Sequence, residues 1–275
     1  MFTCKHICNY GTTENATIAF MMTKLIETVR ECKELFLEGY YSHKNVNYKG
    51  TVDLVTEYDV AIEKRLTEAL HKEFGDFTIV GEESTKEITH PKKAIYIDPI
   101  DGTTNFVHGL PFCAISVGVW EDGKPIAGIV YNPVLDECFY AKRGEGAYLN
   151  GEKIAVSKQK EFQQSLVSTG FPYTKVEKGE DYDWVLRTMA SLLPITRDIR
   201  RFGSAAIDIC YVAYGKFDAY YECNLKPWDV AAAILILEEA GGRISDEKGR
   251  SYSLGDHIIL CSNTLVHDIL VKNIE

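Results

Sequence analysis

The sequence lacks any long hydrophobic run and any excess of positive charge. No window approaches the roughly 18 to 20 apolar residues that span a bilayer, and no basic stretch followed by an apolar run opens the chain. The formal net charge is −10, whereas nucleic acids and anionic membranes are bound by clustered Lys and Arg. We therefore expect a cytoplasmic protein that binds neither nucleic acid nor membrane. An anionic substrate would then need a local source of positive charge, such as a metal ion.

Paired cysteine clusters, internal repeats and long linkers are absent as well. The eight cysteines are scattered, and several lie in apolar segments, which is typical of reduced, buried thiols. Cys4, His6 and Cys8 lie close together, but structural zinc sites usually need a second cluster, and the sequence offers none. Residues 1–21 are therefore interpreted as a poorly ordered leader.

The 275 residues are 45% hydrophobic, enough for one large domain or two closely packed ones. Helical spacing of apolar residues covers 22–39, where Gly39 is predicted to end the helix, and 57–74, where Thr56 is predicted to cap it with Asp59. β-rich runs follow at 77–80, 94–98, 113–120, 125–131 and 137–142. Hairpin sequences at 121–124 and 150–151 indicate antiparallel pairing.

The second half of the chain has a different pattern. Predicted strands at 166–168, 196–200 and 217–222 alternate with predicted helices at 181–193, 204–214 and 228–240, as in α/β units. We therefore predict an α/β (α+β) protein with an antiparallel-rich, metal-binding N-terminal half over 22–160 and an α/β C-terminal half over 161–275, the two sharing one cleft.

Acidic residues follow two of the predicted strands. Glu82 lies just after the strand at 77–80, and Asp98 ends the next one, where ligands are often held in layered α/β structures. Pro99 favours an extended Asp98, so the loop can turn Asp98 and Asp101 to one side and present the carbonyl of Ile100. Such an all-oxygen set is the kind that Mg²⁺ prefers.

Electrostatics and the adjoining backbone indicate the same kind of site. Carboxylates within ~4 to 6 Å of one another repel unless a cation is bound, and a divalent ion would also attract a phosphate. Gly102 lets N–H groups approach a ligand, and a helix starting near Thr103 would direct its positive end there. Asp229 starts another predicted helix. Considered alone, Asp229 would be interpreted as an N-terminal helix cap. It becomes a candidate metal ligand only together with the other acidic residues.

Four strings in this order resemble the inositol monophosphatase family from about residue 22 to the C-terminus. They are Asp53-Leu54-Val55-Thr56 with Asp59, Gly81-Glu82-Glu83-Ser84, Asp98-Pro99-Ile100-Asp101-Gly102-Thr103-Thr104-Asn105-Phe106, and Trp228-Asp229-Val230-Ala231-Ala232. The resemblance implies a layered αβαβα sandwich, a homodimer, and Mg²⁺-dependent hydrolysis of a small polyol phosphate by a metal-activated water without a phosphoenzyme.

The resemblance also assigns roles, residue by residue. Two or three Mg²⁺ ions are implied: Glu82, Asp98 and the Ile100 carbonyl would hold the first and Glu82 also a third, while Asp98, Asp101 and Asp229 would hold the second. Thr103 and Asp59, together with Glu82, would orient and activate the water. The N–H groups of Gly102 and Thr103 would bind the phosphate, and Ala205 and Glu222 would line the polyol.

Several alternatives stay open. A haloacid-dehalogenase-type phosphatase needs one residue between its two aspartates, whereas two separate Asp98 from Asp101. A catalytically silent binding protein would keep the fold without turnover. Within the family, the substrate could be myo-inositol monophosphate, NADP, fructose-1,6-bisphosphate or an adenosine bisphosphate, and lithium sensitivity is undecided. Arg200 and Arg201 could face either phosphate or solvent.

Overall fold

The computed structural model of the chain describes residues 13–42, 46–48 and 54–274. Cys4, His6, Cys8 and Asp53 lie outside the described residues, so the predictions for them are not tested. Within the described ranges, no helix is both long enough and apolar enough to cross a membrane.

Seven strands form the first sheet, in the order β3-β4-β5-β6-β7-β8-β9. β3 and β4 are parallel, and all the other neighbours are antiparallel, as the hairpin sequences predicted. Asn150 and Gly151 have φ of 51° and 91° in the β8–β9 turn, which is the left-handed backbone that hairpin turns of this kind need. The strands are Thr78–Gly81, Lys93–Asp101, Ala114–Glu121, Lys124–Asn132, Glu137–Lys142, Gly146–Leu149 and Glu152–Ile154.

Five strands form the second sheet, in the order β11-β10-β12-β14-β13. β10 pairs in parallel with β11 and β12, whereas β14 is antiparallel to β12 and β13. The α/β alternation predicted for this half is confirmed, but the sequence patterns did not reveal β13, β14 and the final helix. The strands are Leu166–Thr169 (β10), Asp198–Arg200 (β11), Ala219–Cys223 (β12), Arg243–Ser245 (β13) and Ile258–Ser262 (β14).

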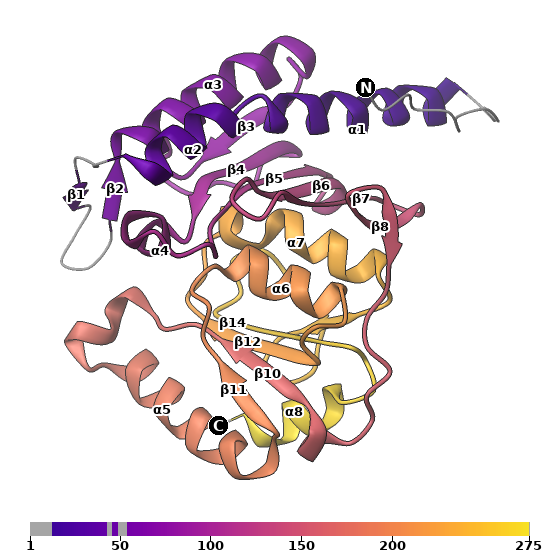
Figure 1. Cartoon of the computed structure of the whole chain (residues 1–275). Coiled ribbons are helices and arrows are strands. Elements are labelled where there is room, and N and C mark those ends of the chain that lie inside the picture. The colour runs from indigo at the N-terminus through magenta and orange to yellow at the C-terminus, as the bar shows by residue number, and fades with distance from the viewer. Residues whose placement is uncertain (1–12, 43–45, 49–53, 275) are drawn as a thin grey trace.

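Helices and sheets alternate in five layers, visible from top to bottom in Figure 1. The outer helices α1 (Thr13–Arg30), α2 (Lys33–Tyr41) and α3 (Glu57–Glu73) share a core with one face of the first sheet. α6 (Ala205–Ala213) and α7 (Pro227–Glu239) lie between the two sheets. α5 (Glu180–Leu192) and α8 (His267–Asn273) cover the far face of the second sheet. The predicted αβαβα sandwich is therefore confirmed.

The first predicted helix is wrong at both ends. The structure has two helices, α1 from Thr13 and α2 to Tyr41, separated at residues 31–32. At the break the Cys32 N–H bonds the carbonyl of Val29, three residues back, so the last turn of α1 tightens before α2 begins. Gly39 does not end a helix. A Cβ there would lie 2.5 Å from the Tyr58 ring, so glycine allows α2 to approach α3 closely.

Two glycines in the first sheet let α7 lie directly on its strands. A Cβ on Gly118 would lie 2.6 Å from the carbonyl carbon of Ala231, and one on Gly128 would lie 2.6 Å from the carbonyl oxygen of Ala232. The backbone of α7 therefore touches β5 and β6, and this contact sets where the start of α7, with Asp229, lies relative to β4.

Gly118→Ala is expected to destabilise the protein by about 1–3 kcal/mol, because the added methyl overpacks the α7–sheet contact. Urea denaturation measures the change. Gly179→Ala is the matched control, since a Cβ there meets nothing within 4 Å. Equal stabilities for the two variants would contradict the proposed close packing.

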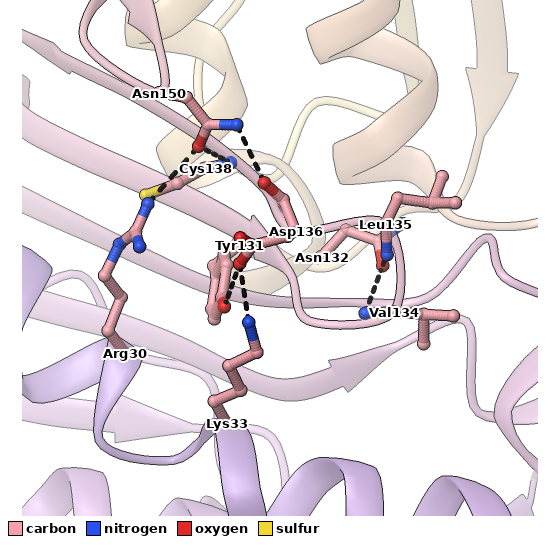
Figure 2. Close-up of polar contacts among 9 residues, drawn as sticks. All are labelled: Arg30, Lys33, Tyr131, Asn132, Val134, Leu135, Asp136, Cys138 and Asn150. Carbon is pink, nitrogen blue, oxygen red and sulfur yellow. Dashed lines mark hydrogen bonds and ion pairs between the residues drawn. The ribbon is translucent and has the colours of Figure 1, made fainter.

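A polar network ties the N-terminal helices to the β6–β7 hairpin (Figure 2). Asp136 Oδ1 accepts hydrogen bonds from Lys33 Nζ and the Tyr131 hydroxyl, both at 2.8 Å. Asn150 accepts one from Arg30 at 3.3 Å and donates to the Asp136 carbonyl at 2.8 Å. The bonds from Lys33 and Tyr131 lower the pKa of Asp136. The β8–β9 turn, the β6–β7 turn and two helices are thus held at one corner.

His267 is a buried histidine that joins α8 to the second sheet. Its Nε2 lies 2.8 Å from the Ser245 hydroxyl and its Nδ1 lies 2.8 Å from that of Ser262. Burial, with a contribution from Arg243, lowers its pKa from 6.5 to about 4. The unfolded chain therefore binds a proton that the native protein excludes between these pH values.

Stability that depends on neutral His267 is expected to be complete above pH 6.5 and to be lost as the pH falls towards 4. The slope can reach about 1.4 kcal/mol per pH unit. His267→Gln removes the titrating group, so its unfolding free energy should depend less steeply on pH in this window. Urea denaturation at a series of pH values measures the slopes, with the exposed His71→Gln as control. A wild-type slope in His267→Gln would refute the assignment.

Candidate active site

The acidic residues predicted at strand ends meet at one end of the first sheet. β4 runs to Asp101, and its pairing with β5 shifts register between Asp98 and Asp101, where Pro99 and Ile100 bulge out. Gly81 ends β3 opposite Ile97, and the N–H of Glu82 bonds the Ile97 carbonyl at 3.0 Å. This places Glu82 beside Asp98, close enough for the two carboxyl groups to interact electrostatically.

Asp229 joins this group from the first turn of α7. Its Oδ2 accepts the Lys226 N–H at 2.7 Å, so the capping role considered from the sequence is real. The same carboxylate lines a pocket with Asp101, and its pKa is raised by burial and by the charges of Glu82 and Asp101. Capping and membership of the acidic cluster are therefore compatible at this residue.

The cluster is buried and electrostatically strained. Asp98 and Asp101 are 2% and 8% exposed, and burial is the largest cause of the raised pKa of Asp98, Asp101 and Asp229. The charges of neighbouring carboxylates raise these pKa values further. The pKa of Asp101 rises only to about 6, because Ser204 Oγ at 2.5 Å and the Ala206 N–H at 2.8 Å donate to it. Hard oxygen donors that repel one another fit a divalent cation such as Mg²⁺.

Asp59 and Thr103 form a hydrogen-bonded chain next to the cluster. Asp59 is fully buried, and its Oδ2 accepts from the N–H and the hydroxyl of Thr56, completing the predicted cap of α3. The Thr103 hydroxyl lies 3.2 Å from Asp59 Oδ1 and 3.0 Å from the Ile100 carbonyl. A hydroxyl in this position can pass a proton to Asp59.

Gly102 is a position where only glycine fits. Its φ is +87°, and a Cβ would lie 2.8 Å from the Phe112 carbonyl oxygen. It precedes the short helix α4 (Thr103–His108), which starts at the predicted residue. Asn105 in α4 donates to the carbonyls of Phe112 and Phe202, both at 2.7 Å, and so connects the aspartate loop to the C-terminal half.

Residues of the C-terminal half form the opposite wall of the pocket. Ala205 and Glu222 line it together with Asp101, Gly102 and Thr103, so all four predicted substrate contacts face one cavity. Glu222 is buried, packs over Gly170 and accepts a hydrogen bond from the Tyr220 hydroxyl. Burial raises its pKa to about 7, although Arg201 and Lys175 act to lower it.

The two arginines that were left undecided point to different surroundings. Arg201 lines the pocket and lies 5.2 Å from the centre of the Phe171 ring, whereas Arg200 pairs with Asp198 at 2.5 Å outside the pocket. Phe171, Tyr173, Lys175 and Leu225 also line the pocket and were missed. They follow the ends of β10 and β12, so the strand-end rule that found Glu82 after β3 would have indicated them.

Glu63 is a further residue that the sequence reasoning missed. It is buried in α3 and accepts the N–H groups of Glu83 at 2.8 Å and Ser84 at 2.9 Å, which fixes the loop carrying Glu82. A Cβ on Gly81 would lie 2.4 Å from the Glu63 carboxyl carbon, so glycine is needed there too. The sequence did offer one signal, because Glu63 is a charged residue on the apolar face of the helix predicted at 57–74.

Comparisons with known proteins agree with this geometry. Residues 19–275 match the profile of the inositol monophosphatase family. The chain is 37% identical to inositol monophosphatase 3 of Solanum lycopersicum, over 94% of this chain and 98% of the relative. It is 36% identical to the Nus factor SuhB of Pasteurella multocida, over 92% of this chain and 95% of the relative. The solved structure of SuhB from Bartonella henselae superposes with a TM-score of 0.86 at 32% identity, covering 93% of this chain and 98% of the SuhB chain. The solved structure of a Thermotoga maritima IMPase superposes with a TM-score of 0.83 at 33% identity, covering 94% of this chain and 96% of the IMPase chain.

Proposed function

Because the chain belongs to the inositol monophosphatase family and is a phosphoric monoester hydrolase, we propose that it hydrolyses the phosphate monoester of a small polyol with the help of Mg²⁺. Myo-inositol monophosphate is the first candidate substrate. One observation carries the proposal: the buried carboxylates Asp98, Asp101 and Asp229 meet, with Glu82, beside a pocket whose other wall holds Glu222 and Arg201.

The residues proposed to hold the metal are those that repel one another without it. Glu82, Asp98 and the Ile100 carbonyl would bind the first ion and Asp98, Asp101 and Asp229 the second, with Glu82 also available to a third. When bound, Mg²⁺ would supply Lewis acidity towards the phosphoryl oxygens and the attacking water. The donor set supports this, since its members are hard oxygens whose main electrostatic neighbours are further carboxylates.

The remaining steps belong to side chains and backbone. Glu82 and the Thr103 hydroxyl orient the attacking water, and its proton passes through Thr103 Oγ1 to Asp59 Oδ1, 3.2 Å away. The N–H groups of Gly102 and Thr103 bind the phosphate, where a side chain at Gly102 would clash with the Phe112 carbonyl. No residue needs to carry a phosphoryl group.

The pocket wall favours a polyol as the leaving group. Glu222 is a buried acceptor for substrate hydroxyls, and Ala205 beside it leaves room for a ring. A staphylococcal IMPase at 27% identity has been solved with inositol monophosphate and also with 2'-AMP, so a nucleotide substrate is the second candidate. Phe171 and Arg201 provide a surface on which an adenine could stack, and NADP or adenosine bisphosphate would use it. A homodimer is proposed from the family resemblance alone.

The test is a phosphate-release panel with Mg²⁺ over myo-inositol monophosphate, fructose-1,6-bisphosphate, NADP and adenosine 3',5'-bisphosphate, each with and without Li⁺. We expect the highest kcat/KM with the inositol ester and none without Mg²⁺. Preference for NADP or a bisphosphate would replace the polyol by the second candidate. Covalent labelling of an aspartate during turnover, or no release from any ester, would overturn the mechanism.

We expect Glu222→Gln to raise KM for inositol monophosphate by about tenfold while changing kcat less, because it weakens a hydroxyl acceptor remote from the phosphoryl group. Steady-state kinetics measure both constants. Glu239→Gln is the control, since Glu239 accepts backbone N–H groups of the β7–β8 turn, away from the pocket. A loss confined to kcat would instead place Glu222 in the chemical step.

A further inference from the structure

A second group of metal-binding side chain types lies outside the carboxylate cluster. Asp181 is in the first turn of α5, Cys223 ends β12, and His257 directly precedes β14. Their ligand atoms all lie within 4.8 Å of one another. A carboxylate, a thiol and an imidazole are thus brought together from three separate segments.

Hydrogen bonds already orient this group. His257 Nε2 lies 2.8 Å from Asp181 Oδ1, while the other oxygen of Asp181 accepts from Thr174 at 2.9 Å and Asn224 at 3.2 Å. Cys223 is 1% exposed and packs on the α5 face of β12, opposite to Glu222. His257 is exposed, so solvent reaches the group from one side.

We propose that Asp181, Cys223 and His257 form a binding site for Zn²⁺ or a similar borderline-soft divalent cation, with a fourth position open to water. Sulfur and imidazole ligands select such ions over Mg²⁺. Metal bonds of about 2.0–2.3 Å put the ligand atoms of one tetrahedral ion roughly 3.5 Å apart. The Cys223 thiol must therefore come closer, and His257 Nε2 must move slightly away from Asp181 Oδ1, which the exposed His257 side chain can do. The Cys223 thiol releases its proton to solvent as the metal–sulfur bond forms.

The site is continuous with the substrate pocket. Cys223 follows Glu222 and lies two residues before Leu225, while Thr174, which binds Asp181, lies between Tyr173 and Lys175, and these four neighbours line the pocket. Drawing Cys223 towards Asp181 pulls the end of β12 away from the pocket, so metal binding raises KM for the substrate. This coupling rests on the proposed function, whereas the metal site does not.

Titration of the full chain with Co²⁺ tests the site, because a thiolate ligand gives a charge-transfer band that the all-oxygen Mg²⁺ site cannot give. We expect one equivalent of Co²⁺ to produce the band, Zn²⁺ to displace it, and Cys4→Ser/Cys8→Ser to retain it. Cys223→Ser should abolish it. His257→Gln, at an exposed position where a substitution is expected to leave the fold intact, should weaken binding at least about tenfold.

Cys261→Ser is the matched control, since Cys261 is a buried free thiol on the neighbouring strand β14. Persistence of the band in Cys223→Ser, its loss in Cys4→Ser/Cys8→Ser, or unchanged affinity in His257→Gln would overturn the site. For the coupling, Zn²⁺ at saturating Mg²⁺ should raise KM in the wild type and not in His257→Gln. Equal inhibition of the wild type and His257→Gln by Zn²⁺ would refute the coupling to the substrate pocket. The metal site itself is then judged by the Co²⁺ titration alone.

Discussion

Asp98→Asn is expected to lower Mg²⁺-dependent phosphate release at least about 1,000-fold, a loss of about 4 kcal/mol of transition-state stabilisation. Asp98 is the carboxylate that the proposed metal sites share, and its pKa is raised by burial and, in addition, by Glu82, Asp101 and Asp229. An amide keeps the shape and still accepts the Ile100 N–H that bonds Asp98 Oδ1 at 3.0 Å. It lacks the charge that a cation needs.

The same substitution should leave the fold intact and stabilise the metal-free protein, because it removes one charge from a buried, self-repelling group. Activity and urea denaturation are measured on the same preparations. Asp268→Asn, at an exposed position in α8, serves as the control and should retain full activity. Retained activity in Asp98→Asn would refute the metal assignment, and loss of activity together with unfolding would mean that Asp98 is structural.

The conformational preferences of neighbouring residues were enough to predict the part of the site that the loop from Pro99 to Thr103 forms. Pro99, Gly102 and the start of α4 at Thr103 follow from backbone chemistry that neighbouring residues decide. The strand-end rule placed Glu82 correctly just after β3, because apolar runs are visible in the sequence, whereas Asp98 lies inside β4, which continues through a bulge to Asp101. These features therefore needed no knowledge of the tertiary structure.

Features that depend on distant segments were not visible. The break at Cys32 arises where α1 and α2 both pack on the first sheet, and the apolar spacing does not mark it. Glu63 became interpretable only when the loop at Glu83 was seen to lie over α3. Arg200 and Arg201 are adjacent in sequence, yet only Arg201 faces the pocket, because the direction of a strand-end side chain depends on the packing of β11.

Mg²⁺ is expected to stabilise the protein strongly at neutral pH and weakly in mild acid. Burial raises the pKa of Asp101 from 3.8 to about 6, and it raises those of Asp98 and Asp229 as well. A raised carboxyl pKa means that the native state holds protons that the unfolded chain has lost, so stability falls as the pH rises through 6. Above this pH Asp101 is charged beside the other buried carboxylates, which costs stability unless a cation is bound.

Saturation at about 100 times Kd would stabilise the native state by about 2.7 kcal/mol. For a chain of this size that raises Tm by about 5 °C or more. Thermal unfolding with Mg²⁺, compared with Na⁺ at equal ionic strength, measures the shift at about pH 7.5 and about pH 5. The shift should shrink at the lower pH, where protons already neutralise the cluster, and should vanish in Asp98→Asn. A shift of equal size at both pH values, or one that survives in Asp98→Asn, would show that Mg²⁺ acts elsewhere on the molecule and that the buried carboxylates do not hold it.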